Sequence, residues 1–110
     1  MIAFEVRLNG KRVCIAGAED LAVLNTIISA SGKLGPKTVP ALPGDASGEI
    51  FYSVGGVTAR PDPRKDVHVR WKSVAPLKVG DVVQVKVLDV KKADRAKLRK
   101  KAVRKPPAAT

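Results

Sequence analysis

An Asn-Gly pair at positions 9 and 10 constrains this chain more than any other local feature. Asn and Gly tolerate two successive positive φ angles, which a two-residue type I′ turn requires. The residues on both sides alternate between apolar and polar, as in strands with one buried face. The pattern therefore predicts a β-hairpin over residues 2–16. Its predicted cross-strand pairs are Leu8 with Lys11, Val6 with Val13, Phe4 with Ile15 and Glu5 with Cys14.

Short alternating segments recur along the rest of the chain and predict further strands. Residues 19–31 fit a helix or a strand, and their β-branched side chains favour the strand. Gly55 and Gly56 interrupt the next strand, which indicates a bulge or a close approach of two backbones. Further strands are expected over 67–72 and 82–90. We therefore predict a mainly β fold, a small antiparallel sandwich or barrel of about six strands.

The strand predicted over residues 67–72 has one apolar face and one basic face. Val67, Val69 and Trp71 alternate with His68, Arg70 and Lys72. We expect the Trp71 ring to be buried and the three basic side chains to face solvent.

Composition excludes several classes of protein. The chain has 110 residues, 45% of them apolar, which suits one domain with one modest core. No apolar run approaches the roughly 20 residues of a membrane span, and charges at Glu5 and Arg7 argue against a signal peptide. One Cys and one His can form neither an internal disulfide nor a closed zinc site. We expect a cytoplasmic protein that holds no metal and no cofactor.

The positive charge is concentrated at the end of the chain. Residues 1–90 carry 12 basic and 9 acidic side chains, a net charge of +3. Residues 91–110 carry nine basic side chains and one acidic side chain, a net charge of +8. This division predicts a β-rich domain over 1–90 and a basic tail of Lys, Arg, Ala and Pro over 91–110. Strong helix formers over 91–103 predict a helix there, which the prolines at 106 and 107 would end.

Two resemblances accompany these patterns. Leu8-Asn9-Gly10, Ala16-Gly17, Asp20 with Val23-Leu24, and Trp71 with Leu77, Val79, Gly80 and Asp81 resemble a group of small, functionally uncharacterised bacterial β-proteins. This resemblance spans residues 1–90 and implies a fold but no functional residue. The tail resembles the basic tails of histone-like proteins.

Motifs that would indicate catalysis are incomplete. Residues 32–38 partly match a phosphate-binding loop, but Pro36 replaces a required N–H donor. Cys14 and His68 could pair as nucleophile and base, but the alternation places both away from the apolar face and neither supports nor excludes a contact, so a structural Cys is favoured. The aspartates at 62, 66 and 81 lie in expected turns, where Asp commonly caps N–H groups. We therefore expect a protein that is not an enzyme.

The basic tail is the main candidate site, because clustered cations bind phosphates by counterion release without recognising sequence. We expect it to bind nucleic acid or another polyanion, such as an acidic protein. The alternatives are a tail that only aids solubility, and a protein-interaction module of the immunity or inhibitor type that uses the β domain or the 32–48 loop. The candidate tail residues are Lys91, Lys92, Arg95, Lys97, Arg99, Lys100, Lys101, Arg104 and Lys105. An auxiliary patch is expected at His68, Arg70, Lys72, Arg60 and Arg64.

Overall fold

A computed structural model describes residues 1–39 and 48–102, whose regular secondary structure is almost entirely β-strand. One short 3-10 helix, η1 (Pro63–Lys65), precedes the fifth strand. No helix among the described residues is long and apolar enough to cross a membrane. The strands are β1 (Ile2–Leu8), β2 (Lys11–Ala16), β3 (Leu21–Ser31), β4 (Glu49–Thr58), β5 (Val67–Pro76), β6 (Val83–Asp89) and β7 (Leu98–Lys101).

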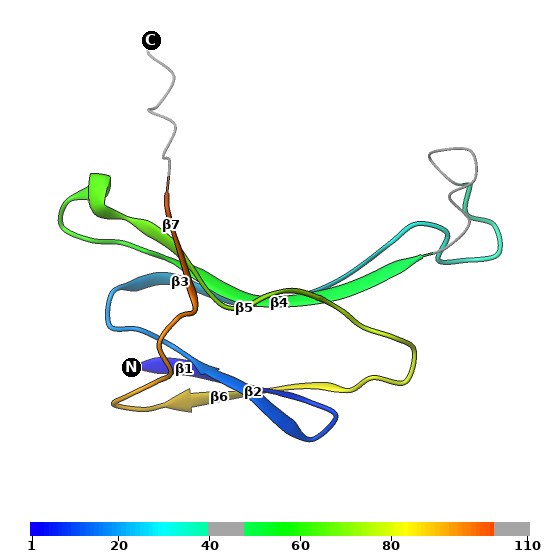
Figure 1. Ribbon diagram of the computed structural model, residues 1–110, viewed down its shortest axis with the longest axis horizontal. Helices are drawn as coiled ribbons and strands as arrows, with labels where there is room; N and C mark the ends of the chain where they lie inside the picture. Colours follow the sequence, from blue (N-terminus) through cyan, green and yellow to red (C-terminus); the bar gives the residue numbers. More distant parts are fainter. Residues whose placement is uncertain (40–47, 103–110) are drawn as a thin grey trace, which may run out of the picture.

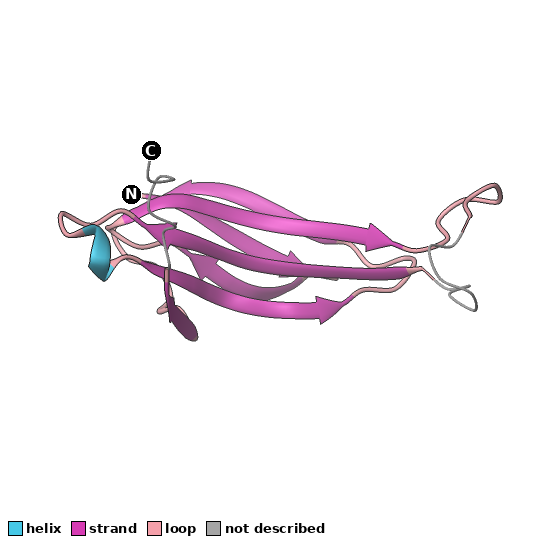
Figure 2. Cartoon of the chain, turned by 90° about the horizontal axis from the view of Figure 1, so that it is seen from above, coloured by secondary structure: helices cyan, strands magenta, loops and turns pink. Residues whose placement is uncertain are grey.

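The strands form two antiparallel sheets, one below the other in Figure 1. The small sheet has the order β2-β1-β6, and the large sheet has the order β3-β4-β5-β7. Figure 2 shows β3 and β7 at opposite edges of the large sheet, with β6 on the same side as β3. The predicted mainly β fold is confirmed, with seven strands instead of about six, and residues 21–31 form a strand. The core cluster between the sheets contains Val6, Cys14, Ala16, Val54, Val69 and Trp71.

The first hairpin confirms the predicted turn but not the predicted register. Asn9 and Gly10 have φ angles of 52° and 82°, and Leu8 pairs with Lys11. A β-bulge then intervenes, because Arg7 pairs with Arg12 whereas Val6 pairs with Cys14. The pairs of Val6 with Val13 and of Phe4 with Ile15 are therefore wrong, and Cys14 does not lie opposite Glu5. The extra residue reverses the faces of β2 beyond the bulge and buries Cys14 and Ala16 in the core.

The two glycines of β4 show both features that the sequence indicated. The register of β4 against β5 shifts on either side of Val54. A Cβ atom on Gly56 would lie 2.2 Å from the carbonyl oxygen of Val23, and one on Gly55 would lie 2.8 Å from that of Val69. Glycine is therefore needed here so that β4 can approach both neighbouring strands.

The basic segment does not form the predicted helix. Among the described residues 91–102, the backbone is extended and ends in β7, which pairs with β5 at the edge of the large sheet. The helix prediction rested on residue propensities, and hydrogen bonds to the body of the protein override such weak preferences. Residues 103–110, including Arg104 and Lys105, lie outside the described part of the chain.

Candidate polyanion-binding surface

Asp94, the single acidic residue of the basic segment, fastens that segment to both sheets. Its backbone N–H donates to the carbonyl oxygen of Ile15 at 2.8 Å, and its Oδ2 accepts from the Ile15 N–H at 2.8 Å. Its carbonyl oxygen accepts a hydrogen bond of 2.7 Å from Nε1 of Trp71. The Trp71 side chain is only 2% exposed, so the prediction of its burial is confirmed. A buried indole N–H needs an acceptor, and Asp94 supplies one.

Beyond Asp94, the segment continues as the edge strand β7. Val69 pairs with Arg99, and His68 pairs with Lys100. The ladder is closed at its ends by Lys97, whose N–H donates to the Arg70 carbonyl at 2.8 Å, and by Ala102, whose N–H donates to the Asp66 carbonyl at 3.0 Å. These hydrogen bonds fix the cations of β7 in place relative to β5.

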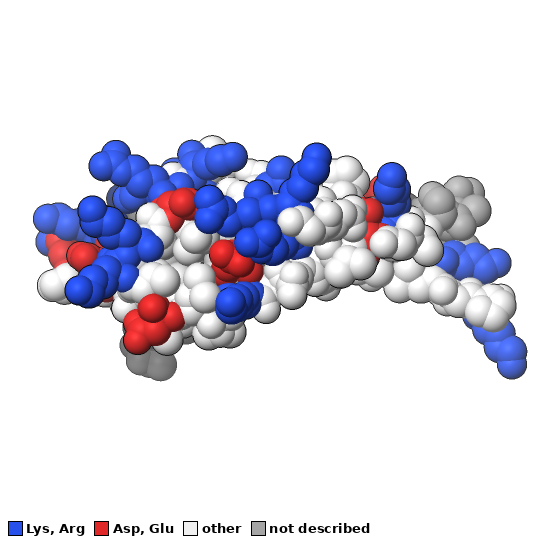
Figure 3. Space-filling model, turned by 90° about the horizontal axis from the view of Figure 1, so that it is seen from below, with Lys and Arg blue, Asp and Glu red and all other residues white. Residues whose placement is uncertain are grey.

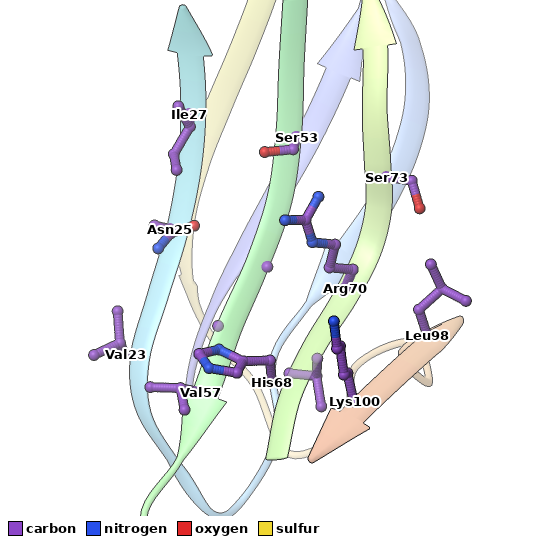
Figure 4. A pocket seen from close by; sticks show the side chains of 13 residues that line it. Val23, Asn25, Ile27, Ser53, Val57, His68, Arg70, Ser73, Leu98 and Lys100 are labelled. Carbon is purple, nitrogen blue, oxygen red and sulfur yellow. The ribbon is translucent and has the colours of Figure 1, made fainter. Parts of the chain in front are cut away.

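A groove of about 630 Å³ crosses the outer face of the large sheet (Figure 4). Its basic side comes from β5 and β7, where the Lys100 side chain points toward Arg70 and His68 lies beside them. Its other side, on β3 and β4, is mostly apolar or small. An anionic group could therefore contact the cations while an attached apolar group lies against Val23, Ile27 and Val57.

Four other cations of the segment lie around a second hollow, which has mixed charge. Paired residues of a ladder point to the same face, so Arg99 faces away from the groove, as its partner Val69 does. The second hollow is lined by Lys91, Lys92, Arg95 and Arg99 together with Glu19, Asp20, Asp94 and Trp71. The predicted tail cations are thus divided between two faces and do not form a single row.

The seven described cations of the segment have no ion-pair partner among the described residues. They are all exposed, in contrast to arginines elsewhere that are tied to carboxylates. Seen from the side of the small sheet, most Lys and Arg side chains gather over one half of the molecule, and a few more lie toward its other end (Figure 3). The seven are Lys91, Lys92, Arg95, Lys97, Arg99, Lys100 and Lys101.

The predicted auxiliary patch is brought together only in part. His68 and Arg70 line the groove, as expected. Lys72 does not line the groove. Trp71 is an extra residue in the β4–β5 ladder, so Lys72 pairs with the inward-facing Val54 and lies on the other face from Arg70. Arg60 forms an ion pair of 2.9 Å with Asp20, and Arg64 forms one of 3.1 Å with Asp62. Both arginines are therefore already engaged by carboxylates.

The incomplete catalytic motifs have structural roles. Cys14 is buried between the sheets, where burial raises its pKa to about 11, whereas His68 lies on the outer face of the large sheet. The Gly35 N–H donates a hydrogen bond to Thr38 Oγ1 within the same turn. Asp81 accepts from the Lys78 N–H and from Asn9 Nδ2, which lowers its pKa. No group of three or more metal-ligating side chains occurs within 1–39 and 48–102.

Sequence reasoning identified the cations of the site but not the residues that arrange them. Asp94 was counted only as a charge, and Leu98, Val23 and Ile27 were not assigned to a binding surface. One usable pattern was present, since Leu98 and Lys100 occupy alternate positions, as side chains on one face of a strand do.

Comparisons of the chain with family models, curated proteins and solved structures find no match. They therefore supply no function.

Proposed function

We propose that this protein is not an enzyme but binds nucleic acid, or a polyanion of similar charge density, through the edge formed by β5 and β7. The observation that carries the proposal is the group of exposed cations on and next to β7 that have no ion-pair partner among the described residues, namely Lys97, Arg99, Lys100 and Lys101. Releasing the counterions condensed on phosphates is the main source of affinity for such a surface.

Ordering of the cations also supports the proposal. A free basic arm would lose backbone conformational freedom on binding, at about 1–2 kcal/mol for each residue that becomes fixed. The backbone of β7 has already lost much of this freedom on folding, because Lys97 and Ala102 are hydrogen-bonded to the body of the protein. The paired His68 and Lys100, with Arg70 beside them, offer a compact group of donors for phosphate oxygens.

The test is the salt dependence of binding to a DNA duplex. We expect the logarithm of the affinity to fall linearly with the logarithm of salt concentration, with a slope of about −0.9 per phosphate neutralised. Replacing Lys97, Arg99, Lys100 and Lys101 by Gln should weaken binding to all sequences alike and flatten the slope by roughly two to three units.

A matched variant separates a defined site from net charge alone. Replacing Lys33, Lys37, Lys78 and Lys86 by Gln removes the same charge from other exposed positions. This control variant should keep most of the affinity and slope. Equal losses in the two variants, or binding that does not depend on salt, would contradict the proposal.

An acidic protein is the second candidate partner, and the apolar side of the groove favours it. Val23 and Ile27 are 47% and 48% exposed beside the cations. Bases stack on aromatic side chains, and this apolar surface has none, so it suits a protein better than nucleic acid. A protein partner would be indicated if Ile27→Ser weakened capture of that partner while leaving DNA binding unchanged.

A further inference from the structure

We infer that β3 is an interface between two copies of this chain, which pair through their β3 edges to form one continuous eight-stranded sheet. This inference does not depend on the proposed polyanion binding. It rests on the composition of β3, on the open side of the two-sheet packing, and on the symmetry of the β3 sequence.

The β3 edge lacks most of the features that normally prevent strands from pairing between molecules, and its one irregularity is a register shift against β4 between Leu21 and Val23. Natural edge strands carry Lys, Pro, bulges or a covering element, or are kept very short. β3 is 11 residues long and contains no charged residue, no Pro and no Gly. Its sheet partner is β4, and among the described residues no strand pairs with its other edge.

The interior of the molecule is also open on this side. β6 lies on the same side as β3 (Figures 2 and 4). Val85 and Val87 pair with Val6 and Phe4 and so face the large sheet, yet they are 40% and 65% exposed. Ile28 of β3 pairs with the buried Tyr52 and so faces the same side, yet it is 56% exposed. A second molecule placed against this side would cover apolar surface that the single chain leaves in water.

Charge favours a second copy here over any other edge. The chain has a net charge of +11, so two copies repel each other wherever their cations approach. The β3 and β4 strands carry one charged residue between them, Glu49. The cations of β7 lie at the opposite edge of the sheet. Pairing through β3 therefore keeps the basic edges of the two copies far apart, and screening weakens what repulsion remains.

The β3 sequence fits itself across a two-fold axis at Thr26. Directly paired residues face the same side, so Thr26 opposite Thr26 pairs residues 23–29 of each copy, beyond the register shift between Leu21 and Val23. Leu24 then lies opposite Ile28 of the second copy on the inner face, and Asn25 lies opposite Ile27 on the outer face. A facing Thr is a favourable cross-strand neighbour for Thr26.

The test measures the molar mass of the whole chain by sedimentation, over concentrations from micromolar to millimolar. We expect a species of twice the 11.7 kDa chain mass at the upper end. Ile27→Lys should raise the dimer dissociation constant by roughly tenfold or more, because it places two cations on an edge that must pair. Val79→Lys is the matched control: this valine is 92% exposed, outside β3, and its substitution should leave the dimer intact.

A charge exchange tests the register. In the double variant Asn25→Glu, Ile27→Lys, each Lys faces the Glu of the other copy, so the dimer should return. Circular dichroism should show folded protein in every variant. A wild-type chain that stays monomeric throughout, or an Ile27→Lys variant that dimerises like the wild type, would overturn the inference. A double variant that stays monomeric would overturn the register centred on Thr26.

Discussion

The two edges of the large sheet, β7 and β3, differ in almost every respect that governs what can bind to them. β7 is four residues long and includes Arg99, Lys100 and Lys101, whereas β3 is 11 residues long and carries no charge. A charged edge resists pairing with another strand and attracts anions, whereas an uncharged edge has the opposite preference. One sheet thus presents two kinds of interface, and the side chains of its edge strands determine which is which.

The edges also differ in what holds them. β3 is held by the long ladder that its 11 residues form with β4, and the two strands come very close at Gly56. β7 is short and depends on Asp94, Trp71 and the hydrogen bonds of Lys97 and Ala102. Substitutions can therefore disturb one edge more than the other.

The largest effect is expected from Trp71→Ala, which should lower the free energy of unfolding by about 3–5 kcal/mol. The substitution empties the centre of the core cluster and removes the donor that holds the Asp94 carbonyl oxygen. Urea denaturation measures the change. A loss below about 1 kcal/mol would show that the ring does not support the β7 edge.

At the other edge, Gly56→Ala should cost about 1–3 kcal/mol, because a new Cβ would meet the Val23 carbonyl oxygen and force β3 away from β4. Gly35→Ala is the control, since its Cβ would lie 3.5 Å from its nearest neighbour, Thr38 Oγ1. Urea denaturation of the two variants should differ clearly. Equal stability would mean that β3 is not held as closely as described.

Asp94→Ala should have a smaller effect on stability, about 1 kcal/mol for the lost hydrogen bond to the Ile15 N–H. Its local effect should be larger, because the substitution loosens the attachment of the basic segment. Amide hydrogen exchange should accelerate at Lys97 and Ala102 and stay unchanged in β3. Uniform acceleration in both edges would argue against a local anchor.

The sequence predicts the turns of this fold better than the registers of its strands. The turn at Asn9-Gly10 was predictable because its two φ angles select those residues locally. The bulge beyond it was not, because it depends on Cys14 and Ala16 packing beneath Trp71 from the other sheet. The strand over 21–31 was predictable from its β-branched residues.

The candidate site was predictable in composition but not in arrangement. Counting Lys and Arg identified the described cations, because charge is a property of the sequence alone. The division of these cations between two faces follows from the pairing of β7 with β5, a long-range contact made through Asp94. Helix propensity over 91–103 pointed the other way, and the register shift at Trp71 in the β4–β5 ladder turned Lys72 away from the expected patch.

Stability should also depend on alkaline pH. Burial, followed by the charge of Asp94, raises the pKa of Cys14 from 9.0 to about 11. Above pH 9 the unfolded chain loses this proton while the folded chain keeps it, so stability should fall as pH rises from 9 to 11. Subtracting the same curve for Cys14→Ala isolates the contribution. A difference that does not change over this range would contradict the burial of the thiol.

The most direct test of the contrast between the edges is NMR mapping of amide shifts as a short DNA duplex is added at low salt. The expected result is perturbation over 97–101 and at His68 and Arg70, and none over 24–30 in β3. Perturbations spread evenly over all exposed cations, including Lys33, Lys37, Lys78 and Lys86, would contradict it, as would perturbations centred on β3.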